Sequence, residues 1–236
     1  MKYILTTIIL LLGYFAQAQQ SHPTLNVIGS SELSASPTMT IVSLSIDSKE
    51  SAYDQSVKNL IRRIDLLTDD LKSIGFSEDQ IITSTFSVSE NYEYINNSRV
   101  KDGFHASQTI KVSFKQDKKR LLEVLNKAVS SSANATIFLS FDIDNERKDR
   151  LKKELIKLAV KDAKIKGEII ANESGFKIIG IKEINYTIGY GSYNDFIPIT
   201  MQPSVADQLD IKISNFESEN LTFRDQVQIT FIIEKK

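Results

Sequence analysis

Histidine is scarce in this sequence and cysteine is absent, so two of the side chains most often used in nucleophilic and acid–base catalysis offer few candidates. The chain has two histidines, His22 and His105, and no cysteine. A Ser-His-Asp hydrolase would have to use His105, because His22 lies in a polar segment near the N-terminus. No Gly-x-Ser-x-Gly elbow is present, and the glycine pair in Gly189-Tyr190-Gly191-Ser192 lacks the strand–turn–helix context of a phosphate loop. We therefore interpret His105 as an ordinary strand residue.

Acidic and aromatic side chains offer the remaining candidates. Asp142, Asp144 and Glu146 alternate, and on an extended strand they would share one face that could bind a hard cation such as calcium. The glycine and the terminal glutamate of an EF-hand loop are missing, so we interpret these carboxylates as a solvated strand end. Tyr92 and Tyr94 are predicted to be sheet-face aromatics rather than a sugar platform. No pair of carboxylates stands out for glycoside hydrolysis, whose two acids are close in space rather than in sequence. We assign no catalytic residue, no cofactor-binding residue and no metal ligand.

The first eighteen residues predict an export signal. Lys2 supplies a positive start, residues 3–15 form an apolar run, and Ala16-Gln17-Ala18 presents small residues at the two positions that a signal peptidase reads. The run is shorter than the ~20 residues that span a bilayer, so a retained anchor is the weaker alternative. We expect residues 1–18 to be a cleaved signal peptide, residues 19–24 a flexible tail, and residues 25–236 the folded domain.

Composition excludes several classes of protein. The chain has 29 basic and 30 acidic residues, and removal of the leader with Lys2 leaves 28 and 30, a formal charge of −2. This balance argues against nucleic-acid binding, which favours concentrated basic patches. The basic tract at residues 147–154 is interrupted by acids and is predicted to be a solvated helix face. The absence of cysteine excludes disulfides, thiol catalysis, cysteine-based zinc sites and acylation at a lipobox cysteine.

Alternation of apolar and polar residues predicts a mainly antiparallel set of strands. Strands are expected at residues 25–29, 40–48, 82–94, 103–115, 137–143, 176–186 and 226–233. Turn residues between 95 and 102 make the third and fourth of these strands a long hairpin.

Two long helices and one short helix accompany the strands. The first long helix is expected to begin at a capping box, Ser51-x-x-Asp54, and to end at Gly75. Its buried stripe is predicted to contain Tyr53, Val57, Leu60, Ile61, Ile64, Leu67, Leu71 and Ile74. Asp117 is expected to cap the short helix, and the second long helix is expected from about Glu146 to Ser174, before Gly175. The mixture of hairpins and helices predicts an α+β fold in which the helices pack on largely antiparallel sheet.

Two features suggest contact surfaces. Ala159, Ala163, Gly167 and Ala171 recur every four residues and form a stripe of small side chains. The stripe is explained either by tight packing on the chain's own sheet or by a helix–helix contact between subunits. Residues 187–208 are irregular, contain two glycines and two prolines, and carry several aromatic and aliphatic side chains. This segment is interpreted as an assembly arm, a lid over a ligand, or a hairpin extension folded over its own sheet.

Together these pieces resemble the SIMPL domain, also called DUF541, over most of residues 25–235. The resemblance rests on Val27-x-Gly29, Gly75-Phe76-x-x-x-Gln80-Ile81-x-Thr83, Gly103-Phe104-x-Ala106, Ala133-Asn134 and, most specifically, Ala159-x-x-Asp162-Ala163 continuing through Ala171, Gly175 and Gly180 to Ile184. The chain departs from the family pattern with Gly167 for a usual alanine, Phe104 for tyrosine, and Pro37-Thr38 where Pro-Asp is common. No established catalytic set comes with the family, so these departures affect no active residue.

The resemblance implies a location in the periplasm or cell envelope. It also implies a homo-oligomer, because some relatives assemble into ring- or channel-like particles, and association with the outer membrane or with other envelope proteins. Other relatives are linked to oxidative-stress tolerance, and a eukaryotic relative is an adaptor in kinase signalling. We therefore expect a non-enzymatic, self-assembling structural or interaction module. The alternative is a periplasmic ligand-binding protein or hydrolase with an unidentified site, and a metal-binding protein is a third, weaker hypothesis.

Overall fold

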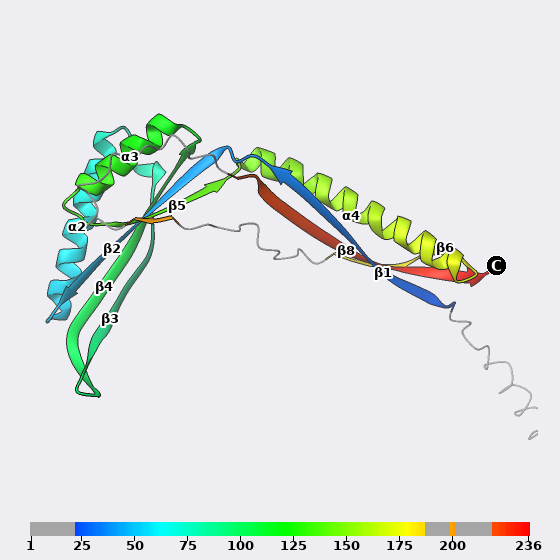
Figure 1. Cartoon of the computed structure of the whole chain (residues 1–236), viewed down its shortest axis with the longest axis horizontal. Helices are drawn as coiled ribbons and strands as arrows, with labels where there is room; N and C mark the ends of the chain where they lie inside the picture. The colour runs from blue at the N-terminus through cyan, green and yellow to red at the C-terminus, as the bar shows by residue number, and fades with distance from the viewer. Residues whose placement is uncertain (1–21, 187–198, 202–218) are drawn as a thin grey trace, which may run out of the picture. The chain divides into compact units, whose positions relative to one another are not determined.

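The computed structural model describes residues 22–186, 199–201 and 219–236 (Figure 1). The elements are β1 (Thr24–Ala35), β2 (Met39–Glu50), α2 (Tyr53–Ser73), η1 (Glu78–Gln80), β3 (Ile81–Ile95), β4 (Ser98–Lys115), α3 (Lys118–Ser130), β5 (Thr136–Asp142), α4 (Asn145–Glu173), β6 (Phe176–Asn185), β7 (Ile199–Met201) and β8 (Leu221–Lys235). The predicted α+β class, with helices on antiparallel sheet, is confirmed. No helix in the described part of the chain is long and apolar enough to cross a membrane.

The chain divides into two compact units. The described part of the first unit comprises residues 22–32, 152–186 and 224–236, and that of the second comprises residues 33–151, 199–201 and 219–223. A three-stranded sheet with the order β1-β8-β6 organises the first unit, and a five-stranded sheet with the order β3-β4-β2-β5-β7 organises the second.

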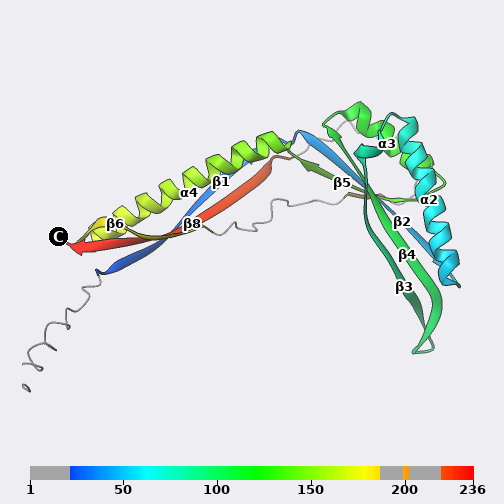
Figure 2. The same ribbon diagram turned by 180° about the vertical axis from the view of Figure 1, so that it is seen from behind.

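In the three-stranded sheet, α4 covers one face, as both ribbon views show (Figures 1 and 2). The buried side chains of β8 alternate along the strand and include Val227, Ile229 and Phe231. They pack against Ala159 and Ala163 of α4 and against Val27 of β1 in one core. The carbonyl of Pro23 accepts a hydrogen bond from the Ile233 N–H at 3.0 Å. Backbone pairing with β8 therefore includes Pro23, which lies in the predicted tail at residues 19–24.

In the five-stranded sheet, α2 and α3 share one face and a second core. Val42, Leu44 and Ile46 of β2 are fully buried there, together with Leu60 and Leu67 of α2. The predicted cap of the short helix is confirmed, because an Asp117 side-chain oxygen accepts from the Lys119 N–H at 2.9 Å. The other face of this sheet carries mostly polar side chains, because polar and apolar residues alternate along β2 and β4.

The end of α2 agrees with the prediction, but its beginning does not. Gly75 adopts φ +91° and donates to the Lys72 carbonyl at 2.9 Å, which ends the helix as expected. The N-cap is Ala52, which makes no side-chain capping bond, so the predicted capping box at Ser51 and Asp54 is wrong. The N-cap lies one residue later in the chain than that box requires.

The predicted buried stripe of α2 also needs correction. Tyr53 is 55 % exposed and Ile61 is 49 % exposed, whereas Ser56 is fully buried. Tyr53 lies in the first turn, beyond the part of α2 that faces the core, and its ring packs edge-on against Phe104 with the centroids 5.7 Å apart. Ile61 follows Leu60 by one residue and therefore points about 100° away from the buried side.

The hairpin prediction is confirmed and sharpened. The strands β3 and β4 pair in antiparallel fashion from Ile81↔Val112 to Ile95↔Ser98. Asn96 and Asn97 make the turn, with φ values of 49° and 64°. Two consecutive residues with positive φ are typical of the tight type I′ turn, which asparagine tolerates. The hairpin is therefore longer than predicted, with a two-residue turn in place of an eight-residue one.

Candidate functional site

The histidine that a hydrolase would need lies on the polar face of the five-stranded sheet. His105 Nε2 is 3.8 Å from Asp47 Oδ2, too long for a hydrogen bond, and Ser89 is the cross-strand partner of His105. Within the described residues no hydrogen bond joins His105 to a serine side chain. The three residue types of a hydrolytic triad are thus close together on an open strand surface, but they are not linked as a relay.

The three alternating carboxylates do not share one strand face. Strand β5 ends at Asp142 and α4 begins at Asn145, so Asp144 is between them and Glu146 is in the first helical turn. Asp142 pairs with Lys148, and Glu146 pairs with Arg150 at 2.6 Å. The interpretation as one solvated strand end is therefore wrong in its geometry. No group of three potential metal-ligating side chains occurs in the described part of the chain.

Asp144 caps the N-terminus of α4. Its Oδ1 accepts from the Arg147 N–H at 2.9 Å, and its Oδ2 accepts from the Thr38 hydroxyl at 3.0 Å. The bond from the Arg147 backbone, followed by that from Thr38, holds the pKa of the Asp144 carboxyl below its usual value. The ionised carboxylate is thus used to satisfy a free helix N–H, which is a structural role.

The motif residues of β1 and α4 meet at a very close contact between strand and helix. A Cβ placed on Gly29 would lie 2.0 Å from the Ala159 carbonyl oxygen and 2.5 Å from the Ala163 backbone nitrogen. The Ser30 N–H next to it donates to Asp162 Oδ2 at 2.8 Å. The pair with Lys166 at 2.6 Å, and then the Ser30 bond, lower the pKa of Asp162. These motif residues therefore attach α4 to β1.

The stripe of small residues on α4 is used inside the unit. Ala159 and Ala163 are fully buried and Ala171 nearly so. A Cβ on Gly167 would lie 2.7 Å from the Phe231 ring. The interpretation of the stripe as tight packing on the chain's own sheet is confirmed, and the stripe is not free to form a contact between subunits.

The motif residues of the five-stranded unit also have structural roles. The Arg63 side chain donates to the Ala133 carbonyl at 2.8 Å, next to Asn134, which adopts φ +48°. The guanidinium of Arg120 stacks 4.2 Å from the centroid of the Phe76 ring. The motifs identified in the sequence therefore mark positions that hold strands, helices and turns together.

The end of the β3–β4 hairpin carries a cluster that sequence reasoning missed. Tyr92 donates its hydroxyl proton to Glu90 Oε2 at 2.5 Å, and Lys101 Nζ is 2.6 Å from Glu90 Oε1. The Arg99 guanidinium lies 3.8 Å from the Tyr92 ring centroid, and Lys101 Nζ lies 4.4 Å from that of Phe104. We call these five residues the hairpin cluster. The pattern Glu-x-Tyr before the turn and Arg-x-Lys after it is the signal in the sequence, because residues on paired strands face one another.

The electrostatics of the hairpin cluster are those of a satisfied network. The hydrogen bond from Lys101, and then that from Tyr92, lower the pKa of the Glu90 carboxyl. The same bond to Glu90 raises the pKa of the Tyr92 phenol. Each shift favours the form already present at neutral pH, so neither group is brought closer to proton transfer at that pH.

Strand β3 is one edge of the five-stranded sheet and displays apolar side chains. Ile82 is 53 % exposed, Phe86 is 50 % exposed, and Tyr94 is 77 % exposed near the turn. Register shifts between Ser84 and Ser87 and between Glu90 and Tyr92 interrupt the ladder to β4. Tyr94 is the cross-strand partner of Arg99, and its role as a sheet-face aromatic rather than a sugar platform stays a prediction. This edge and the hairpin cluster form the candidate interaction site.

The irregular segment at residues 187–208 lies outside the described residues except for Ile199–Met201, as does the Gly189–Ser192 stretch. Those three residues form β7, which pairs with β5 from Ile137↔Met201 to Leu139↔Ile199. The arm, lid and hairpin-extension interpretations remain hypotheses. The predicted signal peptide at residues 1–18 is also outside the described part.

Comparison with known proteins gives the same family as the sequence motifs and assigns no activity to the chain. A search of curated proteins gave no match. The profile of the SIMPL family, described as a protein of unknown function (DUF541), matches residues 25–231 and thus covers nearly all of the region predicted to fold. The matched region contains both sheets, the close contact at Gly29 and the hairpin cluster. The chain belongs to the SIMPL (DUF541) family.

Proposed function

We propose that this protein is an exported, non-enzymatic module of the cell envelope that associates with copies of itself through the β3 edge of its five-stranded sheet. The observation that carries the proposal is the row of exposed apolar side chains on an edge strand of 15 residues. An edge strand presents backbone N–H and C=O groups that can pair with another chain. Apolar side chains along such an edge add burial energy to that pairing.

The two irregularities in β3 make this edge selective. A β-bulge bends and twists the strand, so a partner cannot pair along its whole length. The regular stretches are Ile81–Ser84, Ser87–Glu90 and Tyr92–Ile95, each of about four residues in register with β4. An edge interrupted in this way disfavours open-ended aggregation and favours one register, which suits an assembly of defined size.

The hairpin cluster supports this proposal because the Glu90–Lys101 ion pair and the Arg99–Tyr92 contact join β3 to β4 near the turn. A contact surface that is ordered before binding loses less conformational entropy when the complex forms. The small-residue stripe of α4 is buried, so we place self-association at the β3 edge rather than at that helix.

We place the module in the periplasm or the outer envelope. The support is the sequence of the first eighteen residues, which has the charge, apolar length and cleavage site of a signal peptide. A role in envelope or oxidative stress is part of the same proposal and follows from the family resemblance.

Light-scattering mass of residues 19–236 at micromolar concentration tests the proposal. We expect a mass well above that of one chain, and a fall towards the monomer in the double variant Ile82→Lys/Phe86→Lys, because lysine at an edge opposes pairing. Ile61→Lys/Leu66→Lys is the matched control, since it also adds two lysines, at positions that are exposed on α2 and lie on no sheet edge. A monomeric wild-type protein, or a double variant with unchanged mass, would contradict assembly through β3.

A further inference from the structure

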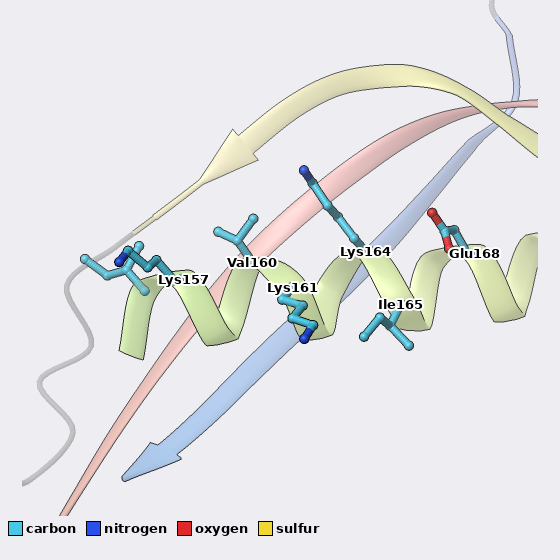
Figure 3. A pocket seen from close by; sticks show the side chains of 7 residues that line it. Lys157, Val160, Lys161, Lys164, Ile165 and Glu168 are labelled. Carbon is cyan, nitrogen blue, oxygen red and sulfur yellow. The ribbon is translucent and has the colours of Figure 1, made fainter. Parts of the chain in front are cut away.

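Helix α4 differs in charge from the rest of the chain. The helix has nine basic and six acidic residues, a formal charge of +3, in a chain whose total is −1. Lys157, Lys161 and Lys164 follow the spacing i, i+4, i+7 and therefore point to one side of the helix. All three are exposed (Figure 3).

Apolar side chains flank this row of lysines. Ile156, Val160 and Ile165 line a shallow hollow of about 470 Å³ together with the three lysines and Glu168. In the described part of the chain every residue that lines the hollow belongs to α4, so no second element closes over it. Such a surface cannot enclose a small molecule, and it suits contact with an extended surface better than capture of a single ligand.

The positive charge of this surface is incompletely compensated. Lys157 has Glu154 at 3.5 Å, but Lys161 and Lys164 form no ion pair with any described residue. By contrast, α2 has a hollow of about 350 Å³ with a similar apolar lining, where Lys58 and Arg62 are balanced by Asp65 and Asp69. The two helices therefore offer hollows of similar size, with a net charge of +2 on α4 and zero on α2.

We infer that the outward side of α4 docks on an anionic lipid bilayer. Lysine ammonium groups would lie among the lipid headgroups while the stems of the lysines and the exposed Ile165 contact the acyl boundary. Val160, at the edge of this surface, stays packed against the core of the three-stranded sheet. The opposite side of α4 is buried against the three-stranded sheet, so the lysine side is available without unfolding. This inference does not depend on self-association.

Vesicle flotation with residues 19–236 tests the inference. We expect binding to vesicles of phosphatidylcholine mixed with phosphatidylglycerol, no binding to phosphatidylcholine alone, and a loss of binding as salt increases. Lys161→Gln/Lys164→Gln should weaken the binding by roughly 30-fold, since each lysine near an anionic surface contributes about a fivefold factor. Glutamine keeps helix propensity, and a thermal melt verifies that the variant folds.

The matched control is Lys58→Gln/Arg62→Gln on α2, which removes the same charge from the neutral hollow and should leave binding unchanged. Equal binding to neutral vesicles, an unaffected α4 variant, or an equal loss in the α2 control would overturn the inference. Binding of monomeric decanoate without binding to vesicles would also overturn it, in favour of a site for a single amphiphile. A mass measurement on the same samples separates this result from the test of the β3 edge.

Discussion

The two long helices, α2 and α4, cover their sheets in opposite ways. On α2 the helix supplies the large side chains, Leu60, Leu67 and Leu71, which are fully buried. On α4 the buried positions are occupied mainly by alanine and glycine, and the sheet supplies the volume through residues such as Phe231. One core is filled by large side chains from both helix and strands, and the other mainly by side chains from the strands.

The difference shows how side-chain size sets the distance between a helix and a sheet. Leucines hold α2 away from its strands and fill the gap between them. Alanine and glycine let α4 approach until backbone atoms of the helix are in contact with Gly29 of β1. Because protein interiors are close-packed, the two arrangements tolerate opposite kinds of mutation. A core filled by large side chains is sensitive to truncation, and a close backbone contact is sensitive to added atoms.

Truncation on α2 should have the largest effect. Leu67→Ala removes a fully buried side chain and leaves a cavity in the core of the five-stranded sheet. We expect a loss of about 2–5 kcal/mol in the free energy of unfolding. Urea titration followed by circular dichroism measures it. Leu66→Ala, next to it but partly exposed, should cost less than about 1 kcal/mol; equal losses for the two variants would show that α2 does not pack as described.

Enlargement at the α4 contact comes next in size. Gly29→Ala places a methyl group 2.0 Å from the Ala159 carbonyl oxygen, a backbone atom that can move only with the helix. We expect a loss of about 1–3 kcal/mol by the same titration. Gly180→Ala is the control on the same sheet, because its Cβ would meet only Ile232 Cδ1 at 3.7 Å. If Gly29→Ala is as stable as the control, strand and helix are farther apart than we describe.

The polar bond at the same contact should have the smallest effect and should depend on pH. The pKa of Asp162 is lowered in the folded state by Lys166 and by the Ser30 N–H, so the ionised form contributes stability above the ordinary value of 3.8 and that contribution is lost as the pH falls below it. Asp162→Asn should cost on the order of 1 kcal/mol at pH 7. Melting temperatures of both proteins at pH 7 and pH 3 should converge at the lower pH. A difference that is the same at both values would exclude the carboxylate as its cause.

Prediction from the sequence succeeded where local rules decide the structure. The alternation along β8, the cap at Asp117 and the end of α2 at Gly75 each depend on residues within a few positions of one another. It failed at the beginning of α2, where Ser51 and Asp54 fit a capping box but Ala52 is the N-cap. Packing of Tyr53 against Phe104 of β4 lies outside any local rule.

The candidate site was less accessible to prediction. In the sequence, Glu90, Arg99 and Lys101 are indistinguishable from ordinary surface charges. The pairing register of the hairpin places them around Tyr92. Asp225 breaks the apolar face of β8, and only the fold shows that the Tyr186 hydroxyl donates to its carboxylate at 2.8 Å. Pairing between strands is a long-range property, and it decides which polar residues find partners.

The sequence by itself determined the α+β class, most elements and the family, because periodicity, turn residues and motif spacing are written in consecutive positions. The tertiary structure alone decided which faces remain available for contact. It buried the small-residue stripe of α4 against β1 and β8, left its lysines exposed, and placed the apolar side chains of β3 on a sheet edge. The physical reason is that a side chain's environment depends on the neighbours that folding brings to it, and those neighbours are distant in the chain.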